Sequence, residues 1–179
     1  MNMRKLFLFL LFFVSCIIIK AQNDSIAVTQ MKEMGVYYFN EATLTQIEPI
    51  IPEGNKVSVG IFKAKATLEF LGENSDNVLN NNPVFYVFIP SMYKDHISIK
   101  QFRMVSLTSK KGMRKLKSLS ASFLKAKVGT DNTVFKVKKL NEECFKLYLD
   151  EQIEAGHYGI FYNYGNGIPR KLYDFDVAK

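Results

Sequence analysis

Short runs of apolar and β-branched residues, separated by turn residues, recur along the chain from Gly35 onward. The run VFYVFI (84–89) is continuously apolar between two prolines, which is typical of a strand buried on both faces. In KVSVGIF the apolar positions alternate from Val57 to Ile61, and the alternation changes phase near Lys63. This change of phase indicates either a bulge or one long strand with two apolar faces.

The rest of the chain continues this pattern. Further strands are expected at 36–40, 102–107, 113–119, 133–140, 144–149, 157–164 and 172–177, and a turn-rich connection at 72–83. Helical periodicity over eleven or more residues is weak, and its best candidate is 118–128. The pattern therefore predicts an all-β fold over residues 35–179. We expect a single antiparallel β-sandwich, immunoglobulin-like or related, with about seven to nine strands.

Residues 1–21 have the pattern of a secretory signal peptide. A basic start precedes an apolar run over residues 6–19, and Ala21 is the small residue before the expected cleavage. The apolar run is shorter than the roughly 18 to 20 residues of a permanent membrane span. The Ala-Gln junction resembles export signals of Gram-negative bacteria. We therefore predict export to the periplasm or the exterior, with residues 22–34 as a polar lead-in.

The segment FVSC offers a second interpretation, in which Cys16 is the lipidated residue of a lipoprotein. However, Phe13 occupies the position three before the cysteine, where a smaller aliphatic side chain is usual. The apolar run also continues through Ile17 to Ile19, where a lipoprotein normally becomes polar. We therefore favour ordinary cleavage after Ala21 and keep lipidation at Cys16 as the alternative.

Charge and cysteine content narrow the classes of function. Removal of residues 1–21 takes away three basic residues and no acidic residue, so the formal charge falls from +7 to +4. The remaining 158 of 179 residues suffice for one domain with its own core. Neither this modest charge nor export favours a nucleic-acid partner. Cys144 alone remains after ordinary cleavage, and its place in the alternating run CFKLYL predicts a buried, unreactive thiol.

The segment EAGHYGIFYNYGNG (154–167) has the composition of a functional loop, with Glu154, His157 and several glycines and tyrosines. Its alternation instead predicts a strand, GNG predicts a turn, and LYDFDV (172–177) predicts a second strand. A spacing of three residues sends Glu154 and His157 to opposite faces of a strand. We therefore expect the closing hairpin of the domain and no pair between these two side chains.

Candidate catalytic and metal-binding groups are few. Zinc requires several His, Cys or carboxylate ligands at one point, and the mature chain has two histidines, 61 positions apart, and one cysteine. The sequence has no Gly-x-Ser-x-Gly motif, and no Ser-x-x-Lys motif lies at an expected helix start. We therefore predict no catalytic residue, no metal and no cofactor. A small hydrolase with His96 or His157 as its base is the alternative.

A basic cluster is the most concrete surface feature. Five cations lie within eight positions of the predicted 102–119 hairpin: Lys110, Lys111, Arg114, Lys115 and Lys117. Such charges often serve only to solvate a hairpin and to discourage edge pairing. They also form a candidate contact for anionic lipid head groups or acidic polysaccharide. Aromatic residues that would stack bases are missing from the cluster, which argues against single-stranded nucleic acid.

Four elements of the chain resemble a group of uncharacterised exported bacterial proteins. They are GVYYF, NPVFYVFIP, FRMVSLTSKKGMRKLK, and IEAGHYGIFYNYG with LYDFDV. Such proteins show a Pro-x-Phe-Tyr strand, a Lys/Arg hairpin, a Pro-Gly-Glu-Tyr-like strand and a terminal Asp-Phe-x-Val strand. In this chain Ala155-Gly156-His157 stands where the resemblance suggests Pro-Gly-Glu. The resemblance spans residues 35–178 and implies export and a β-rich domain, without a known activity.

These features together predict an exported β-sandwich of the cell envelope that acts as a non-catalytic binding or assembly module. The expected partner is an envelope protein or a glycan. Contact with an anionic membrane surface or polysaccharide through the 110–117 hairpin is a further alternative, and the sequence assigns no oligomeric state.

Overall fold

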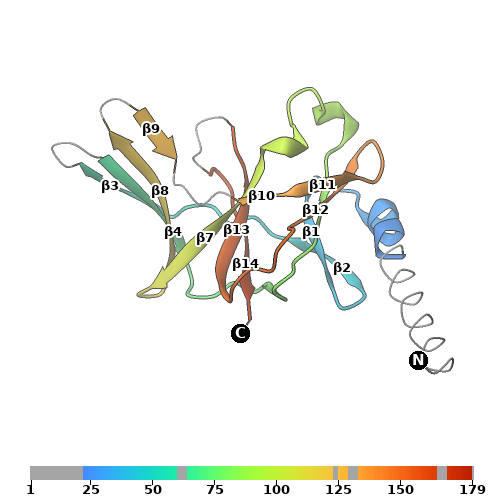
Figure 1. The fold of residues 1–179 in the computed structure, drawn as a ribbon, viewed down its shortest axis with the longest axis horizontal. Coiled ribbons are helices and arrows are strands. Elements are labelled where there is room, and N and C mark those ends of the chain that lie inside the picture. Colours follow the sequence, from blue (N-terminus) through green and yellow to red (C-terminus); the bar gives the residue numbers. More distant parts are fainter. Residues whose placement is uncertain (1–21, 60–63, 123–124, 129–132, 165–168, 179) are drawn as a thin grey trace, which may run out of the picture.

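Two β-sheets pack face to face, and a helix over residues 22–30 covers the outer face of the smaller sheet (Figure 1). This computed structural model describes residues 22–59, 64–122, 125–128, 133–164 and 169–178. Only the backbone is described for residues 55–59, 64–66, 117–122 and 125–128. The predicted signal peptide, residues 1–21, lies outside the described residues. The predicted all-β sandwich is confirmed.

The smaller sheet has five antiparallel strands in the order β11-β12-β6-β1-β2. They are β1 (Gly35–Asn40), β2 (Thr43–Ile47), β6 (Phe85–Phe88), β11 (Lys136–Lys139) and β12 (Cys144–Tyr148). A two-residue turn joins β1 to β2, and its first residue, Glu41, has a φ of 54°. All four residues of β6 are buried between β1 and β12, as its continuous apolar run predicted.

The larger sheet has nine strands, of which seven follow the order β3-β4-β8-β7-β13-β14-β5. They are β3 (Gly54–Val59), β4 (Ala64–Leu71), β5 (Val78–Leu79), β7 (Phe102–Lys110), β8 (Met113–Ser122), β13 (Gly156–Tyr162) and β14 (Tyr173–Val177). Two short strands lie off this path: β9 (Lys125–Val128) pairs with β8, and β10 (Thr133–Val134) pairs with β7. Figure 1 shows β3, β4, β8 and β9 extending away from the smaller sheet.

The main core lies between the two sheets. Its largest side chains are fully buried and come from both sheets: Phe85, Phe175, Ile47, Ile160 and Leu147. The rings of Phe85 and Phe175 meet across the interface with their centroids 5.0 Å apart. Burial of an apolar side chain of this size contributes about 1.5–3 kcal/mol, so this layer is the main contact that holds the sheets together.

A second apolar cluster lies on the opposite face of the larger sheet. Its buried members come mainly from β4, β7, β8 and β13, and they are Leu68, Phe70, Val105, Leu107, Leu116, Phe161 and Leu172. Phe161 belongs to this cluster, whereas its neighbour Ile160 belongs to the main core, because successive strand residues point to opposite faces. The centre of β13 is therefore buried on both faces, whereas its sequence predicted a half-buried strand.

The expected polar lead-in, residues 22–34, begins with the helix at 22–30. Ala27 and Met31 are buried against the outer face of the smaller sheet, in a cluster with Tyr37, Tyr86 and Cys144. The sequence did not predict this helix, because only two buried apolar residues mark its inner face. Cys144 is a free, buried thiol, as predicted, and burial raises its pKa.

Asp24 anchors this helix to the smaller sheet. Its carboxylate accepts hydrogen bonds from Tyr86 at 3.0 Å, from Lys138 at 2.9 Å and from Lys146 at 2.6 Å. Burial raises the pKa of Asp24, but these donors outweigh that effect and leave the pKa below its ordinary value. One carboxylate thus connects the helix to β6, β11 and β12.

Several strands differ from the expected pattern. The segments 43–47 and 78–79 form β2 and β5, although neither was predicted as a strand. Within 118–128, where helical periodicity was weak, residues 118–122 and 125–128 form the end of β8 and β9, and residues 123–124 lie outside the described residues. The change of phase near Lys63 marks the passage between two antiparallel strands, β3 and β4, and residues 60–63 lie outside the described residues. The described residues thus form fourteen strands, against the expected seven to nine. Three of them, β2, β5 and β9, were not predicted, and the predicted strand at 133–140 is two short strands, β10 and β11.

Gly159 marks a close approach between β13 and Leu172. A Cβ atom at Gly159 would lie 2.5 Å from Cγ of Leu172, which is fully buried. Leu172 cannot move aside without leaving the second cluster, so this strand position excludes every side chain.

We expect Gly159→Ala to lower the free energy of unfolding by about 1–3 kcal/mol, because it overpacks a filled space. Urea unfolding of Gly54→Ala is the matched control, since the nearest atom to its Cβ is a Glu69 carboxylate oxygen at 3.9 Å. The control should stay within about 0.5 kcal/mol of the wild type. Equal losses in both variants would contradict the role given to Leu172.

Asp24→Asn should destabilise the protein by about 1–3 kcal/mol at neutral pH, because it weakens charge-assisted hydrogen bonds in a partly buried site. The folded-state pKa of Asp24 lies below the ordinary 3.8. Its stabilisation is therefore complete above that value and is lost as the pH falls through the lower, folded-state pKa. Urea unfolding at several pH values should show the gap between wild type and variant closing below about pH 4. A gap that persists at pH 2 would refute this assignment.

Candidate functional site

The main cluster of polar side chains in the fold lies around β14. In this strand Phe175 points into the main core, so Asp174 and Asp176 point to the opposite face. The register of β13 with β14 places Asp176 opposite His157 and Asp174 opposite Gly159. The space beside Gly159 is occupied by the side chain of Leu172.

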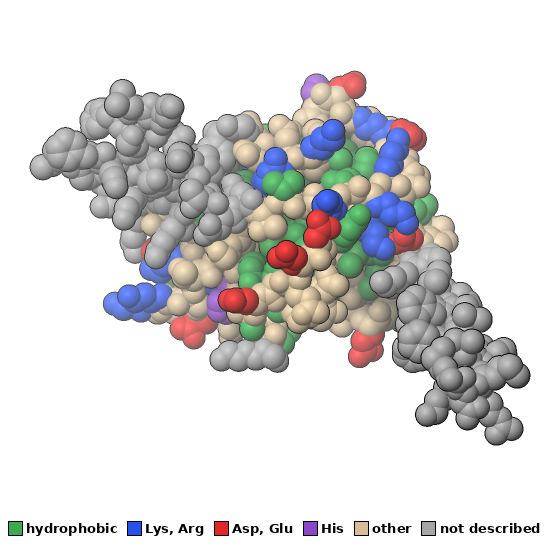
Figure 2. Space-filling model, viewed as in Figure 1, with side chains coloured by type: hydrophobic (Ala, Val, Ile, Leu, Met, Phe, Trp, Pro, Cys, Tyr) green, Lys and Arg blue, Asp and Glu red, His purple; other side chains and the backbone are tan. Residues whose placement is uncertain are grey.

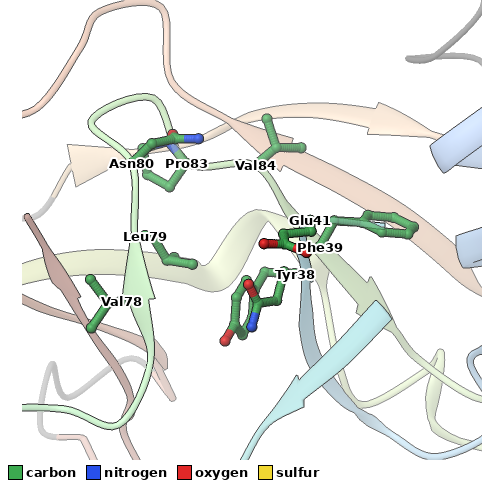
Figure 3. Close-up of a pocket in the computed structure, with 9 residues that line it drawn as sticks. Tyr38, Phe39, Glu41, Val78, Leu79, Asn80, Pro83 and Val84 are labelled. Carbon is green, nitrogen blue, oxygen red and sulfur yellow. The ribbon is translucent and has the colours of Figure 1, made fainter. Parts of the chain in front are cut away.

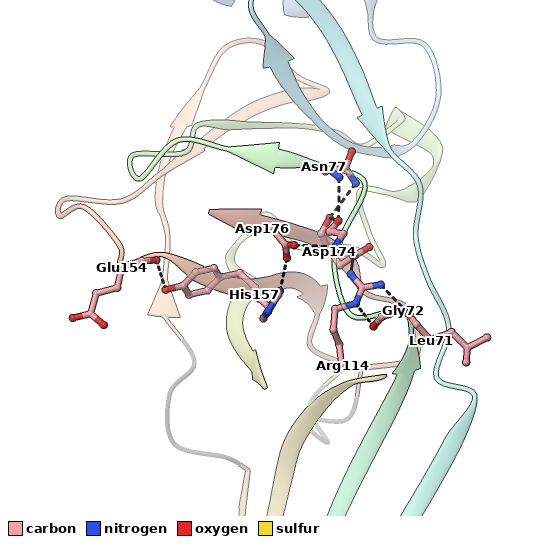
Figure 4. Close-up of polar contacts among 10 residues, drawn as sticks. Leu71, Gly72, Asn77, Arg114, Glu154, His157, Asp174 and Asp176 are labelled. Atoms are coloured by element: carbon pink, nitrogen blue, oxygen red, sulfur yellow. Dashed lines mark hydrogen bonds and ion pairs between the residues drawn. The ribbon is translucent and has the colours of Figure 1, made fainter. Parts of the chain in front are cut away.

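Arg114 of β8 forms an ion pair with Asp174 (Figure 4). Both residues are about 5% exposed or less. The guanidinium also donates from Nε to the Gly72 carbonyl at 3.2 Å and from Nη2 to the Leu71 carbonyl at 2.9 Å. Burial lowers the pKa of Arg114, against the effect of nearby carboxylates. One buried cation thus connects β8, the end of β4 and β14.

The loop after β4 is bound to β14 by a second set of contacts. Ser75 donates its backbone N–H to Asp176 Oδ2 and its hydroxyl to the Asp174 carbonyl, both at 3.0 Å. The Asn77 side-chain amide donates to the same carbonyl at 3.1 Å. The Ser75 hydroxyl is therefore already committed as a donor, so this serine is not poised as a nucleophile.

His157 completes the cluster at its exposed side. Its Nδ1 lies 2.8 Å from Asp176 Oδ1, and a quarter of its side chain is exposed. The Glu154 carboxylate points away from it, and the Glu154 carbonyl accepts a hydrogen bond from the Tyr158 hydroxyl at 2.8 Å (Figure 4). The expectation that Glu154 and His157 do not pair agrees with this geometry, and β13 and β14 are antiparallel as predicted.

The two histidines lie at opposite ends of β13. His96 is exposed in the connection between the short helical turns η1 (Ser91–Tyr93) and η2 (Ile99–Gln101), and its carbonyl accepts from the Tyr162 hydroxyl. His157 and Tyr162 are five strand residues apart, which corresponds to about 17 Å. The fold therefore does not bring the two predicted bases into one site.

The chemistry of the cluster is that of an oriented imidazole without a reaction partner. An aspartate within hydrogen-bond distance of Nδ1 orients the imidazole ring, as in many acid–base sites. Among the described residues, however, no hydroxyl or thiol forms a hydrogen bond with His157. Arg114, Asp174, Ser75 and Asn77 already have hydrogen-bond or ion-pair partners within the cluster.

The predicted basic cluster is dispersed by the fold. Arg114 is no surface cation, because its position on the buried face of β8 directs it to Asp174. Lys115, on the other face, forms an ion pair with Glu69 at 2.8 Å.

Lys110 and Lys111 remain exposed at the hairpin tip, where Gly112 N–H donates to the Glu73 carboxylate at 3.0 Å. The side chain of Lys117 lies outside the described residues. Of the five candidate anion contacts, the described part of the structure thus leaves two at the surface without an acidic partner.

Another group of lysines lies along β11 and β12, where basic and acidic side chains alternate on the surface (Figure 2). Four ion pairs account for them: Lys136–Asp150, Lys138–Asp24, Lys139–Glu142 and Lys146–Asp24. Each of these lysines has a carboxylate partner, so the surface is mixed in charge and does not form a simple anion site.

A small cavity of about 170 Å³ lies between the β1–β2 hairpin and the segment before β6 (Figure 3). Leu79 lies on one side of it, and Tyr38 and Glu41 lie on the other. Ordinary ligand sites have volumes of about 300–1,000 Å³, and this cavity is lined by neither histidine nor cysteine. We assign it no ligand.

Three further findings bear on the class of this protein. Comparison of the chain with protein-family models, with curated proteins and with solved structures finds no match. In the described residues, no three His, Cys, Asp or Glu side chains gather in a way that could hold a metal ion. No helix in that part of the chain has the length and hydropathy of a membrane span.

Most of the polar cluster was not predicted from the sequence. A signal was present in Asp174-Phe175-Asp176, where two acids flank a core aromatic residue and must share the other face of the strand. The sequence does not indicate the partners of these acids. Arg114 lies 60 positions from Asp174, and Ser75 lies 99 positions from Asp174 and 101 from Asp176.

Removal of either member of the buried pair should strongly destabilise the fold. We expect Arg114→Met and Asp174→Leu each to cost about 3–5 kcal/mol, because each leaves one buried charge unpaired. The double variant should lose less than the sum of the two single losses. Urea unfolding provides the measurement, and Lys139→Ala, in an exposed pair, should cost less than about 1 kcal/mol. Strict additivity would contradict a direct coupling.

Proposed function

We propose that the protein is an exported, non-catalytic binding or assembly module of the bacterial cell envelope. The signal-peptide pattern of residues 1–21 supports export, and the β-sandwich is a common scaffold for binding. The observation that carries the non-catalytic part is the saturation of the polar cluster. Arg114, Asp174 and Ser75 are bonded to one another and to backbone, so they stabilise the fold.

A small envelope hydrolase is the second candidate, and the His157–Asp176 pair favours it. An imidazole fixed by a carboxylate is the usual arrangement of a general base. A nucleophile or a bound water is still required, and the Ser75 hydroxyl donates to the Asp174 carbonyl instead. His96, the other base considered, lies at the far end of β13 and takes no part in this pair.

Binding to an anionic surface through the 110–117 hairpin is a weaker alternative. Arg114 and Lys115 are engaged with Asp174 and Glu69, so the exposed cations without an acidic partner in the described part of this segment are Lys110 and Lys111. Two lysines at a hairpin tip beside Glu73 provide little selectivity for an anion.

Expression of the full chain in a Gram-negative host tests the proposal. We expect the mature protein to begin at Gln22 and to fractionate with the periplasm or the medium, and the intact mass gives both the cleavage site and any lipid. Cys16→Ala should be processed in the same way. Accumulation of the uncleaved Cys16→Ala precursor would show lipidation instead, and retention of the wild-type precursor in the cytoplasm would refute export.

The non-catalytic assignment is tested with His157→Gln in the same strain. Cross-linking in intact cells should recover the same envelope partners for the variant and for the wild type, provided that their melting temperatures are similar. A hydrolase would behave differently, because the variant would trap or lose its substrate. A change in the partners of a normally folded His157→Gln protein would therefore favour the second candidate.

A further inference from the structure

The smaller sheet ends in two edge strands of opposite character. At one end β11 carries Lys136, Lys138 and Lys139, all exposed. Charged side chains on an edge strand, lysines above all, are a common device against pairing with another chain. At the other end β2 reads TLTQI and has no charged residue. The sheet is thus protected along β11 and left open along β2.

The backbone of β2 has free hydrogen-bonding groups along its outer edge. Asn40 and Thr43 close the two-residue β1–β2 hairpin, so they form a hydrogen-bonded pair, and such pairs recur at every second residue. Thr43, Thr45 and Ile47 therefore bond to β1, and the N–H and C=O groups of Leu44 and Gln46 point outward. Among the described residues, no strand pairs with this edge, which lies at the rim of the molecule (Figure 1).

These outward groups are self-complementary. When two copies of β2 run antiparallel about a two-fold axis at Thr45, Leu44 of each copy lies opposite Gln46 of the other. Leu44 and Gln46, whose backbone groups point outward, then form the hydrogen-bonded pairs between the two copies. In any other register of the five β2 residues, one of these two would lack a hydrogen-bonded partner. No like charges meet within the strand, since Glu48 lies opposite Ala42 of the other copy.

We propose that β2 pairs with β2 of a second copy of this chain and joins the two smaller sheets into one continuous sheet. The two-fold axis makes the contact isologous and closed, so it yields a dimer and not a fibre. A five-residue strand forms a smaller interface than the roughly 1,200–2,000 Å² of stable complexes. The dimer therefore forms at high concentration and dissociates on dilution.

Sedimentation equilibrium of the protein purified after expression of the full chain tests the pairing, from about 10 μM to about 1 mM. The wild type should move from monomer to dimer in this range. Thr45→Lys and Thr45→Glu should each raise the dissociation constant at least about fivefold, because like charges then face each other across the axis. An equimolar mixture of the two variants should restore dimers, which native mass spectrometry will identify as heterodimers.

Two controls locate the contact. Val137→Glu, on exposed β11, should leave dimerisation unchanged. Gln46→Pro removes an outward N–H and leaves the N–H groups that bond to β1 in place, so it should abolish the dimer even if the charged variants fold poorly. A wild type that stays monomeric at about 1 mM would overturn the proposal. So would a Val137→Glu variant as weak as Thr45→Glu, or a mixture of well-folded Lys and Glu variants that remains monomeric.

Discussion

A buried guanidinium must have its charge neutralised and its donors satisfied, and much of this fold is arranged around that requirement at Arg114. Its partner Asp174 lies on the closing strand, and its other acceptors are backbone carbonyls at the end of β4. Segments distant in sequence therefore meet at one point. The same strand directs Phe175 into the main core. The apolar packing and the polar contacts of Asp174 therefore both depend on the alternation of side chains along β14.

The sequence predicted the β-sandwich because the alternation of apolar and polar residues is visible within each segment, whichever strand that segment pairs with. Longer strands such as β7 and β8 were therefore located, and so was the closing β13–β14 pair. Two-residue strands such as β5 exist only because β14 lies beside them. The helix at 22–30 was missed for the same reason, since Asp24 finds its partners on β6, β11 and β12.

At the candidate site, local sequence patterns predicted less than they did for the strands. A cluster of cations in the sequence was interpreted as one surface, yet alternation along β8 separated Arg114 from Lys115. The acidic partners came from β4 and β14, and no spacing rule predicts them. The described surface therefore carries paired charges together with the exposed Lys110 and Lys111.

The helix at residues 22–30 has a further consequence for Cys144. The thiol lies beneath Ala27 and Met31, so reagents and oxidants reach it only when the helix lifts from the sheet. In an oxidising compartment a lone accessible thiol would cross-link to other chains. The later part of the helix and the residue that follows it thus cover the Cys144 thiol. The rate of thiol modification accordingly measures how often the amino-terminal segment opens.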